Sequence, residues 1–179
     1  MEIAGRAGGL IPTNRFTLRD IVLYGDRGTD VLSGVLEREP WVVDELMATV
    51  PVGEGDVFLI ASNSGVNGSI VGTALWAKEH GHPVIAVTSL EHTARGEPKH
   101  PSGKRLSEVA DVVIDNLAPY GDATLEVADG IGAGAISSMT AAFIAQLLTL
   151  GVARTIAARG ETPPMYISAN IPGGDEHNS

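Results

Sequence analysis

The sequence contains no cysteine among its 179 residues. This absence excludes disulfides, thiolate zinc sites and a cysteine nucleophile, and it fits a reducing cytoplasm. Aromatic residues are also scarce, at 4% of the chain, whereas glycine occurs 22 times. The composition therefore predicts a core of aliphatic side chains and a chain with many tight turns.

Basic residues are also fewer than acidic residues. The chain has 12 Lys and Arg against 22 Asp and Glu, which gives a net charge of −10. A protein that binds the phosphate backbone of DNA or RNA needs a basic surface, so we expect no nucleic-acid partner. The sequence has no unbroken apolar run of about 18 residues and no signal-peptide pattern at its start. We therefore expect no membrane partner and a cytoplasmic location.

What is present is typical of one globular α/β domain, with 44% hydrophobic and 19% charged residues. Short apolar runs alternate with helical patterns, and this alternation predicts a doubly wound parallel sheet with helices on both faces. We expect strands at 57–61, 84–88 and 112–114, and a fourth strand at 125–127.

Apolar spacing predicts the helices between and after these strands. We expect helices over 70–81 and from Ser102 or Gly103 onward, and a long apolar helix over 135–158 that packs on the sheet or on another subunit. Gly130–Gly134 is interpreted as a turn before that long helix.

The two ends of the chain carry weaker patterns. We expect an edge strand at 21–23 and a helix over 30–49 that is interrupted at Glu39 and Pro40. The tail, residues 163–179, is rich in Pro, Gly and polar residues and is expected to be partly flexible.

Ligands of a parallel sheet bind outside the carboxyl ends of its strands, so the residues after each strand are the candidates for a site. After the first strand come Ser62, Asn63, Ser64, Gly65 and Asn67, which precede a helix. The N–H groups at a helix start stabilise anions, and small polar side chains let the backbone approach a phosphate. The alternative is that these residues are only turn formers and helix caps.

A second loop contains Thr88, Ser89, Glu91 and His92. His92 is a candidate acid or base because an imidazole titrates near neutral pH, and the alternative is a solvated loop histidine. Lys104 lies at an expected helix start, where a cation is disfavoured unless it meets an anionic ligand or forms an ion pair.

No residues have the spacing of a metal site, so no metal ligand is expected. The Gly130–Gly134 run lacks a ribose-binding acid downstream, so no dinucleotide cofactor is expected either.

The segments 60–65, 66–81 and 83–89 together resemble the core of a SIS (sugar isomerase) domain. Further segments resemble an uncharacterised bacterial subgroup of phosphosugar-binding SIS proteins, so the resemblance covers almost the whole chain. These segments are 6–10, 100–106, 110–116, 121–123, 168–170 and 173–175.

The resemblance implies a five-stranded parallel sheet of flavodoxin-like order and a homo-oligomer, either a dimer or a tetramer. It also implies that Ser62, Asn63, Ser64 and Gly65 hold a sugar phosphate, with Asn67 standing where Ser or Thr is usual. The function expected is phosphosugar binding, with aldose–ketose isomerisation of a sugar phosphate or amino-sugar phosphate as the reaction. The alternative is a sensing or regulatory subunit that does not turn the sugar phosphate over.

Isomerisation through an enediol needs a base and a charge-stabilising group. Glu2 stands just before a Gly–Arg pair and so resembles the proton-transfer glutamate of sedoheptulose-7-phosphate isomerases. Glu2, Glu91 and His92 are thus the candidate bases, Lys104 is the candidate for charge stabilisation, and Thr88 and Ser89 are candidate substrate contacts.

The sequence departs from the family before Arg6, where SIS domains usually have a helix and a strand that ends in a Gly-x-Gly-x-Ser phosphate loop. We therefore interpret residues 1–179 as a single SIS domain without the family's first strand. An unpaired central strand position invites pairing with another chain, so a partner chain or oligomerisation is a candidate for supplying it.

Overall fold

Three of the predicted strands form one parallel sheet in the computed structural model, which describes residues 2–179. The strands are β1 (Phe58–Ala61), β2 (Val84–Thr88) and β3 (Val112–Asp115), and they are hydrogen-bonded in the order β1-β2-β3. The predicted mixed α/β class is confirmed. A doubly wound sheet has a point at which the order of its strands reverses. The three strands here follow one another in sequence order without such a point, so the doubly wound arrangement stays a prediction.

The two faces of this sheet differ in burial. Phe58 and Ile60 of β1 are buried in the main core, where the Phe58 ring lies 6.1 Å from the ring of Trp76 on α3 (Gly68–Glu79). Leu59 on the other face is 39% exposed, and Val112 of β3 is 50% exposed. Helices are therefore confirmed on one face of the sheet, and a helical layer on the other face stays a prediction.

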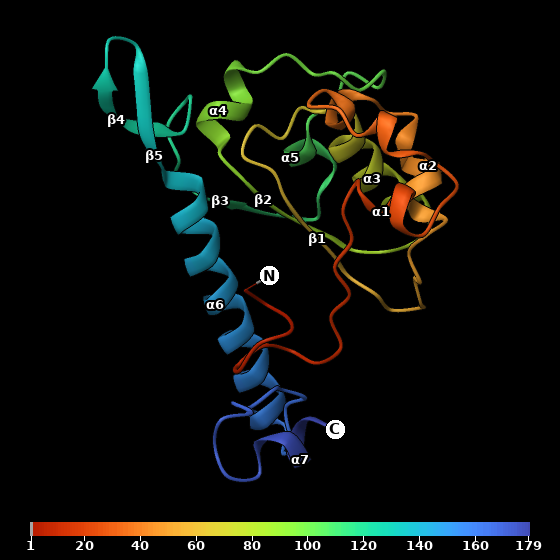
Figure 1. The fold of residues 1–179 in the computed structure, drawn as a ribbon, viewed down its shortest axis with the longest axis vertical. Helices are drawn as coiled ribbons and strands as arrows, with labels where there is room; N and C mark the ends of the chain where they lie inside the picture. The colour runs from red at the N-terminus through yellow and green to blue at the C-terminus, as the bar shows by residue number, and fades with distance from the viewer. Residues whose placement is uncertain (1) are drawn as a thin grey trace. The chain divides into compact units, whose positions relative to one another are not determined.

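The helices that follow the strands position the site. The predicted helix over 70–81 is α3, which connects β1 to β2 and lies with α5 (Leu106–Val109) on the same side of these strands (Figure 1). The segment after β2 was expected to be a loop, but it contains helix α4 (Leu90–Arg95). Ser89 caps this helix, because its hydroxyl oxygen accepts a hydrogen bond from the His92 N–H at 3.0 Å.

Two glycines of α3 bring an N-terminal segment close to the site. A Cβ on Gly68 would lie 2.2 Å from the carbonyl oxygen of Arg38, and a Cβ on Gly72 would lie 2.7 Å from the Val43 side chain. The Ser69 hydroxyl also donates to the carbonyl oxygen of Glu37 at 2.8 Å. The start of α3 therefore packs directly against the backbone at 37–38.

The predictions for this N-terminal segment were wrong in detail. The expected edge strand at 21–23 is a helical turn, since Asp20 accepts the Thr17 N–H at 2.6 Å and starts a helix that buries Ile21. The interruption expected at Glu39 and Pro40 is confirmed, but the segment 30–49 is broken a second time, at Ser33 and Gly34, so it forms short helical turns instead of one interrupted helix. The elements are α1 (Asp20–Leu23), 3₁₀-helices η1 (Thr29–Val31) and η2 (Leu36–Arg38), and α2 (Val42–Met47).

The expected fourth strand exists, but it does not join the parallel sheet. β4 (Ala123–Ala128) pairs antiparallel with β5 (Ile131–Ala135) in a hairpin whose residues are all exposed. The two residues between them are Asp129 and Gly130, and Gly130 has φ +70°. Asp-Gly between two strands is a strong hairpin signal, so the interpretation of Gly130–Gly134 as a turn was wrong beyond Gly130.

The chain divides into two compact units. Phe16–Thr140 contains the sheet and is called the sheet unit below, and residues 2–15 with Ala141–Ser179 form the terminal unit. The division falls within helix α6 (Ile136–Ala158). This helix confirms the long helix expected over 135–158. In the terminal unit Leu10 forms an isolated antiparallel bridge with Met165.

The C-terminal part contains one long apolar helix and one short helix. α6 is long and apolar enough to cross a membrane by length and composition alone, although serine, threonine and glutamine interrupt its apolar residues. Core helices of water-soluble proteins share these properties but are mostly buried, whereas the buried residues of α6 within the described part of the chain are Thr149 and Ala153. The tail contains a short helix, α7 (Gly174–Asn178), and its partial flexibility stays a prediction.

Candidate functional site

The loop between β1 and α3, residues 62–67, folds tightly over the end of β2. Gly65 has φ +62°, and a Cβ at this position would lie 2.9 Å from the Thr88 hydroxyl oxygen and 3.1 Å from that of Thr93. The Gly65 N–H donates to the Ser62 hydroxyl oxygen at 3.3 Å. Only glycine combines this left-handed backbone with this close approach, so the sequence places it at the turn of the loop.

The same loop has hydrogen-bond donors without protein partners. Among residues 2–179, no acceptor takes the backbone N–H of Asn63, Ser64, Val66 or Asn67. The Ser64 hydroxyl likewise has no hydrogen-bond partner in that part of the chain. A group of donors with no acceptor around a loop of this kind is a site for an anion.

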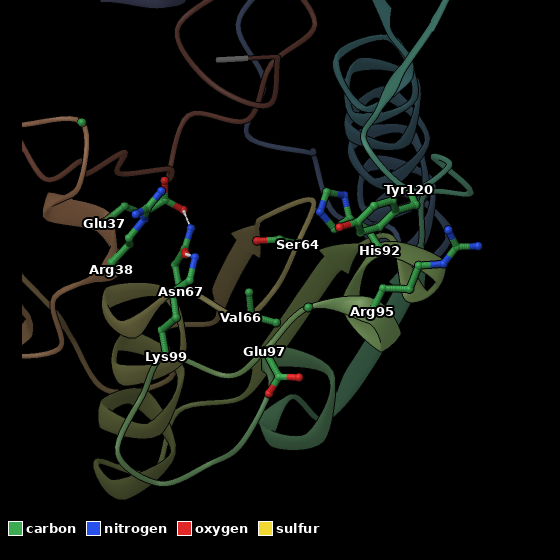
Figure 2. A pocket seen from close by; sticks show the side chains of 12 residues that line it. Glu37, Arg38, Ser64, Val66, Asn67, His92, Arg95, Glu97, Lys99 and Tyr120 are labelled. Atoms are coloured by element: carbon green, nitrogen blue, oxygen red, sulfur yellow. Dashed lines mark hydrogen bonds between the residues drawn. The ribbon is translucent and has the colours of Figure 1, made fainter. Parts of the chain in front are cut away.

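A pocket of about 460 Å³ opens beside this loop and lies wholly within the sheet unit. Figure 2 shows Ser64 and Val66 between two walls, with Asn67 and Lys99 on one side and His92 on the other. The two walls come from different segments of the chain. The first wall also includes Glu37 and Arg38, and the second also includes Arg95 and Tyr120.

The first wall is held by a chain of side-chain hydrogen bonds. Lys99 Nζ donates to Asn67 Oδ1 at 3.0 Å, and Asn67 Nδ2 donates to Glu37 Oε1 at 2.8 Å (Figure 2). The Lys99 backbone N–H donates to the Val66 carbonyl at 2.9 Å. The Arg38 guanidinium forms no ion pair or hydrogen bond with any residue of the described chain, 2–179, so its donors are available.

The second wall is aromatic and cationic. The Arg95 guanidinium lies 5.0 Å from the centre of the Tyr120 ring and 3.1 Å from Glu91 Oε1. The His92 ring centre is 4.9 Å from that of Tyr120. Three cations and two carboxylates, Glu37 and Glu97, line the pocket, so its lining is net positive in a chain of charge −10.

Thr88 and Ser89, two of the predicted substrate contacts, lie beneath the pocket rather than in it. Both are fully buried. Thr88 Oγ1 donates to the Asn63 carbonyl at 3.3 Å, and Ser89 Oγ donates to the Ala118 carbonyl at 2.5 Å. Their hydroxyls are used within the fold, so these residues support the loop from below.

The structure brings some predicted site residues together and separates others. Ser64, Asn67 and His92 line one pocket, whereas Lys104 is exposed and outside its lining. Glu91 is outside the lining as well and pairs with Arg95. Glu2 lies in the terminal unit, where its carboxylate pairs with Arg6 and accepts a hydrogen bond from Gln146 at 3.3 Å.

Outside the pocket lining, burial lowers the pKa of His100, whose ring Nδ1 accepts the Ser102 N–H at 3.1 Å. No group of three or more potential metal ligands occurs within the residues that the structure describes. The site is therefore built from backbone donors, hydroxyls, amides and cations.

Sequence reasoning missed the other charged and aromatic lining residues, which are Glu37, Arg38, Arg95, Glu97, Lys99 and Tyr120. Arg95 and Lys99 follow His92 closely in the sequence. A candidate segment continued past His92 to these two cations would have included them. No local signal marks Arg38, because the close packing of Gly68 against its backbone carbonyl brings it to the pocket.

Comparison with known proteins identifies the relatives of this chain. A family model described as SIS domain matches residues 1–89. UPF0309 protein lin2794 of Listeria innocua is 36% identical over 178 residues, which are 99% of this chain and 71% of the relative. UPF0309 protein TTE0306 of Caldanaerobacter subterraneus is 33% identical over 180 residues, with 99% and 72% covered. UPF0309 protein BH3325 of Halalkalibacterium halodurans is 36% identical over 178 residues, again with 99% and 72% covered.

Proposed function

The chain belongs to the UPF0309 family of SIS-domain proteins, and from this premise we propose that its pocket binds a sugar phosphate. The phosphate lies against the 62–67 loop, and the sugar extends toward the wall that contains His92 and Tyr120. An aromatic ring suits the apolar face of a sugar ring, and the imidazole suits its oxygens.

One observation carries this proposal. Within residues 2–179, the N–H groups of Asn63, Ser64, Val66 and Asn67 and the Ser64 hydroxyl have no partner, and they belong to a loop that borders a pocket lined by Arg38 and Lys99. A phosphate needs several donors and a compensating positive charge, and the loop and the first wall supply both. The same loop before α3 is the segment on which the SIS resemblance depends.

We propose aldose–ketose isomerisation as the reaction of this site. Moving a proton between adjacent sugar carbons needs a base beside them. Glu97 lines the pocket, and its carboxylate has no ion pair or hydrogen bond within residues 2–179, so it is a better-placed base than Glu91, which Arg95 engages. The second candidate function is sugar-phosphate sensing without turnover, which the lining supports equally well because binding needs only the donors and cations.

The first experiment measures the melting temperature of the protein with a panel of sugar phosphates and their unphosphorylated parents. A ligand at one hundred times its Kd stabilises a protein by about 2.7 kcal/mol, which a melting curve resolves. We expect shifts with the phosphorylated compounds only. Equal shifts with phosphorylated and unphosphorylated sugars, or no shift with any compound, would contradict the proposed phosphate site.

A matched pair of serine variants locates the binding. Ser64→Ala removes a pocket hydroxyl, and we expect calorimetry to show about tenfold weaker binding, since hydrogen bonds to charged groups contribute about 1.5–3 kcal/mol. Ser138→Ala removes an exposed hydroxyl outside the pocket lining and serves as the control. Equal affinities for the two variants would place the phosphate elsewhere.

Turnover separates the two candidate functions. We expect Glu97→Gln to abolish conversion of a bound sugar phosphate while its Kd changes little, because the amide keeps the shape and loses the base. Conversion that survives in Glu97→Gln would remove this residue as the base. Saturable binding without conversion in the unaltered protein would favour the sensing function.

The oligomeric state and the partners of the protein stay predictions. The resemblance predicts a dimer or tetramer, and sedimentation equilibrium measures the mass against 18.6 kDa for one chain. The absence of a nucleic-acid or membrane partner and the cytoplasmic location also stay predictions, which binding and localisation experiments test.

A further inference from the structure

A relay of hydrogen bonds leads from the backbone of Ala118 through the side chains of Asn116 and Asn63 to the His92 ring. The backbone N–H of Ala118 donates to Asn116 Oδ1 at 2.9 Å. Asn116 Nδ2 donates to Asn63 Oδ1 at 3.0 Å, and Asn63 Nδ2 lies 3.3 Å from His92 Nδ1. Three residues that are distant in the sequence thus connect the backbone after β3 to the second wall of the pocket.

The first link fixes the direction of every later link. A backbone N–H can only donate, so the Asn116 atom that faces Ala118 must be the oxygen. Asn116 is 4% exposed, and its own N–H donates to the Thr88 carbonyl at 2.9 Å, so its position is fixed as well. The NH₂ group of Asn116 must therefore face Asn63, and an NH₂ group needs an acceptor there.

The same reasoning sets the tautomer of the imidazole. Asn63 turns its oxygen to Asn116 and hence its NH₂ group to His92 Nδ1. That nitrogen must carry a lone pair, so the proton of the neutral ring lies on Nε2. No atom of residues 2–179 accepts a hydrogen bond from Nε2, and His92 lines the pocket.

We propose that Asn116 and Asn63 are positioning residues that hold His92 in the Nε2–H tautomer, so that it presents a hydrogen-bond donor rather than a base to the ligand. The ligand role rests on the proposed sugar-phosphate function, and the tautomer does not. His92 then donates to an oxygen of the bound sugar phosphate. This assignment changes the role that the sequence suggested for His92, which was proton abstraction.

The test uses the full chain labelled with ¹⁵N-histidine and two-bond ¹H–¹⁵N spectra, recorded without ligand at mildly alkaline pH. The chain has five histidines, and His92→Gln identifies the signals of His92 by their loss. We expect the His92 Nδ1 signal at the position of an unprotonated ring nitrogen and the Nε2 signal at that of a protonated one. The reverse pattern would overturn the proposal.

Asn116→Asp is the decisive variant. Its carboxylate still accepts the Ala118 N–H but cannot donate to Asn63, so the Asn63 amide rotates and turns its oxygen to His92. We expect the proton of His92 to move to Nδ1 and the two ¹⁵N signals to exchange character. A spectrum identical to that of the unaltered protein would show that the relay does not set the tautomer.

Asn63→Asp keeps the test open if the buried Asn116 variant does not fold, because Asn63 is only half-buried and its carboxylate forces the same reversal. Asn67→Asp is the matched control, since Asn67 contacts Glu37 and Lys99 and lies outside the relay. It should leave the His92 signals in place.

A binding measurement then tests the donor role. His92→Gln places an amide N–H near the former Nε2, whereas His92→Ala removes the donor, so we expect about tenfold weaker sugar-phosphate binding for His92→Ala and a smaller loss for His92→Gln. Equal losses would overturn the donor role. If no sugar phosphate binds the unaltered protein while the tautomer reverses as described, the proposed function fails and the relay stands.

Discussion

The two loops that follow β1 and β2 have nearly the same chemistry and opposite roles. Ser62, Asn63 and Ser64 end the first strand, and Thr88 and Ser89 end the second, so each loop offers hydroxyls at the same edge of the sheet. The Ser64 hydroxyl at the pocket has no partner among the residues that the structure describes, whereas the hydroxyls of Thr88 and Ser89 are buried and bonded to backbone carbonyls.

This difference separates a binding loop from its support. Substituting a support residue should reduce the free energy of unfolding, because a buried group loses its partner. Substituting an unpartnered side chain of the proposed binding loop, such as Ser64, should reduce ligand affinity and leave the stability of the free protein nearly unchanged. Of the four predictions below, given from the largest expected effect to the smallest, the first two test this division, the third tests the cations of the pocket and the fourth tests the acid sensitivity of the fold.

Gly65→Ala should have the largest effect, because Gly65 is where the two loops touch. The left-handed backbone costs alanine about 1–3 kcal/mol, and the new Cβ must displace the Thr88 hydroxyl 2.9 Å away, which costs about 1–3 kcal/mol more. Denaturant unfolding measures the sum. Gly103→Ala is the matched control, since Gly103 has φ +68° and open space around it, so it should show the first cost alone. Equal losses would mean that the loops are not in close contact.

Ser89→Ala should destabilise the protein by about 1–3 kcal/mol, because it leaves the buried Ala118 carbonyl and the His92 N–H without their partner. Ser64→Ala should change the free energy of unfolding by less than about 0.5 kcal/mol. Denaturant midpoints of the two variants measure the contrast. Comparable destabilisation by both substitutions would erase the distinction between the two loops.

Arg38→Gln should weaken sugar-phosphate binding by about tenfold, since it removes a charge-assisted contact of a pocket cation. Lys104→Gln should leave the affinity unchanged, because Lys104 lies outside the lining although the sequence nominated it. Calorimetric titrations with one sugar phosphate measure both values. A larger loss for Lys104→Gln would restore the sequence-based choice and remove Arg38 from the site.

Asp111→Asn should have the smallest effect, confined to acid conditions. The hydrogen bonds from Lys78, at 2.5 Å, and from the Val84 N–H, at 2.8 Å, hold the pKa of Asp111 below its ordinary value of about 3.8. The folded state thus binds this proton less readily than the unfolded state does. Asp111 therefore contributes stability above about pH 3.8 that is lost as the pH falls through its folded pKa.

Thermal melts recorded from neutral to acid pH should show a shallower fall in Tm for Asp111→Asn than for the unaltered protein. Asp26→Asn, at an exposed aspartate, provides the control. Parallel curves for Asp111→Asn and the unaltered protein would show that this carboxylate adds nothing to acid sensitivity.

Local signals in the sequence predicted the elements whose residues carry strong patterns. The runs at 57–61 and 84–88 are apolar, rich in β-branched residues and bounded by Gly or Pro, and both form strands of the sheet. The segment at 125–127 alternates apolar and charged residues and is also a strand, but it belongs to a hairpin, because the pairing partner of a strand is a long-range property. Asp129-Gly130 was the local signal that distinguishes the two outcomes.

The sequence by itself determined the α/β class, the position of the polar loop between β1 and α3, and the glycine that lets it turn. Tertiary structure alone decided that the hydroxyls of Thr88 and Ser89 form hydrogen bonds within the fold and that the Ser64 hydroxyl lies at the pocket. It also brought Arg38 to the pocket through the close packing of Gly68, and it oriented His92 through Asn116 and Asn63. Turns and periodicity depend on neighbouring residues, whereas burial and hydrogen-bond partners depend on segments that meet only when the chain is folded.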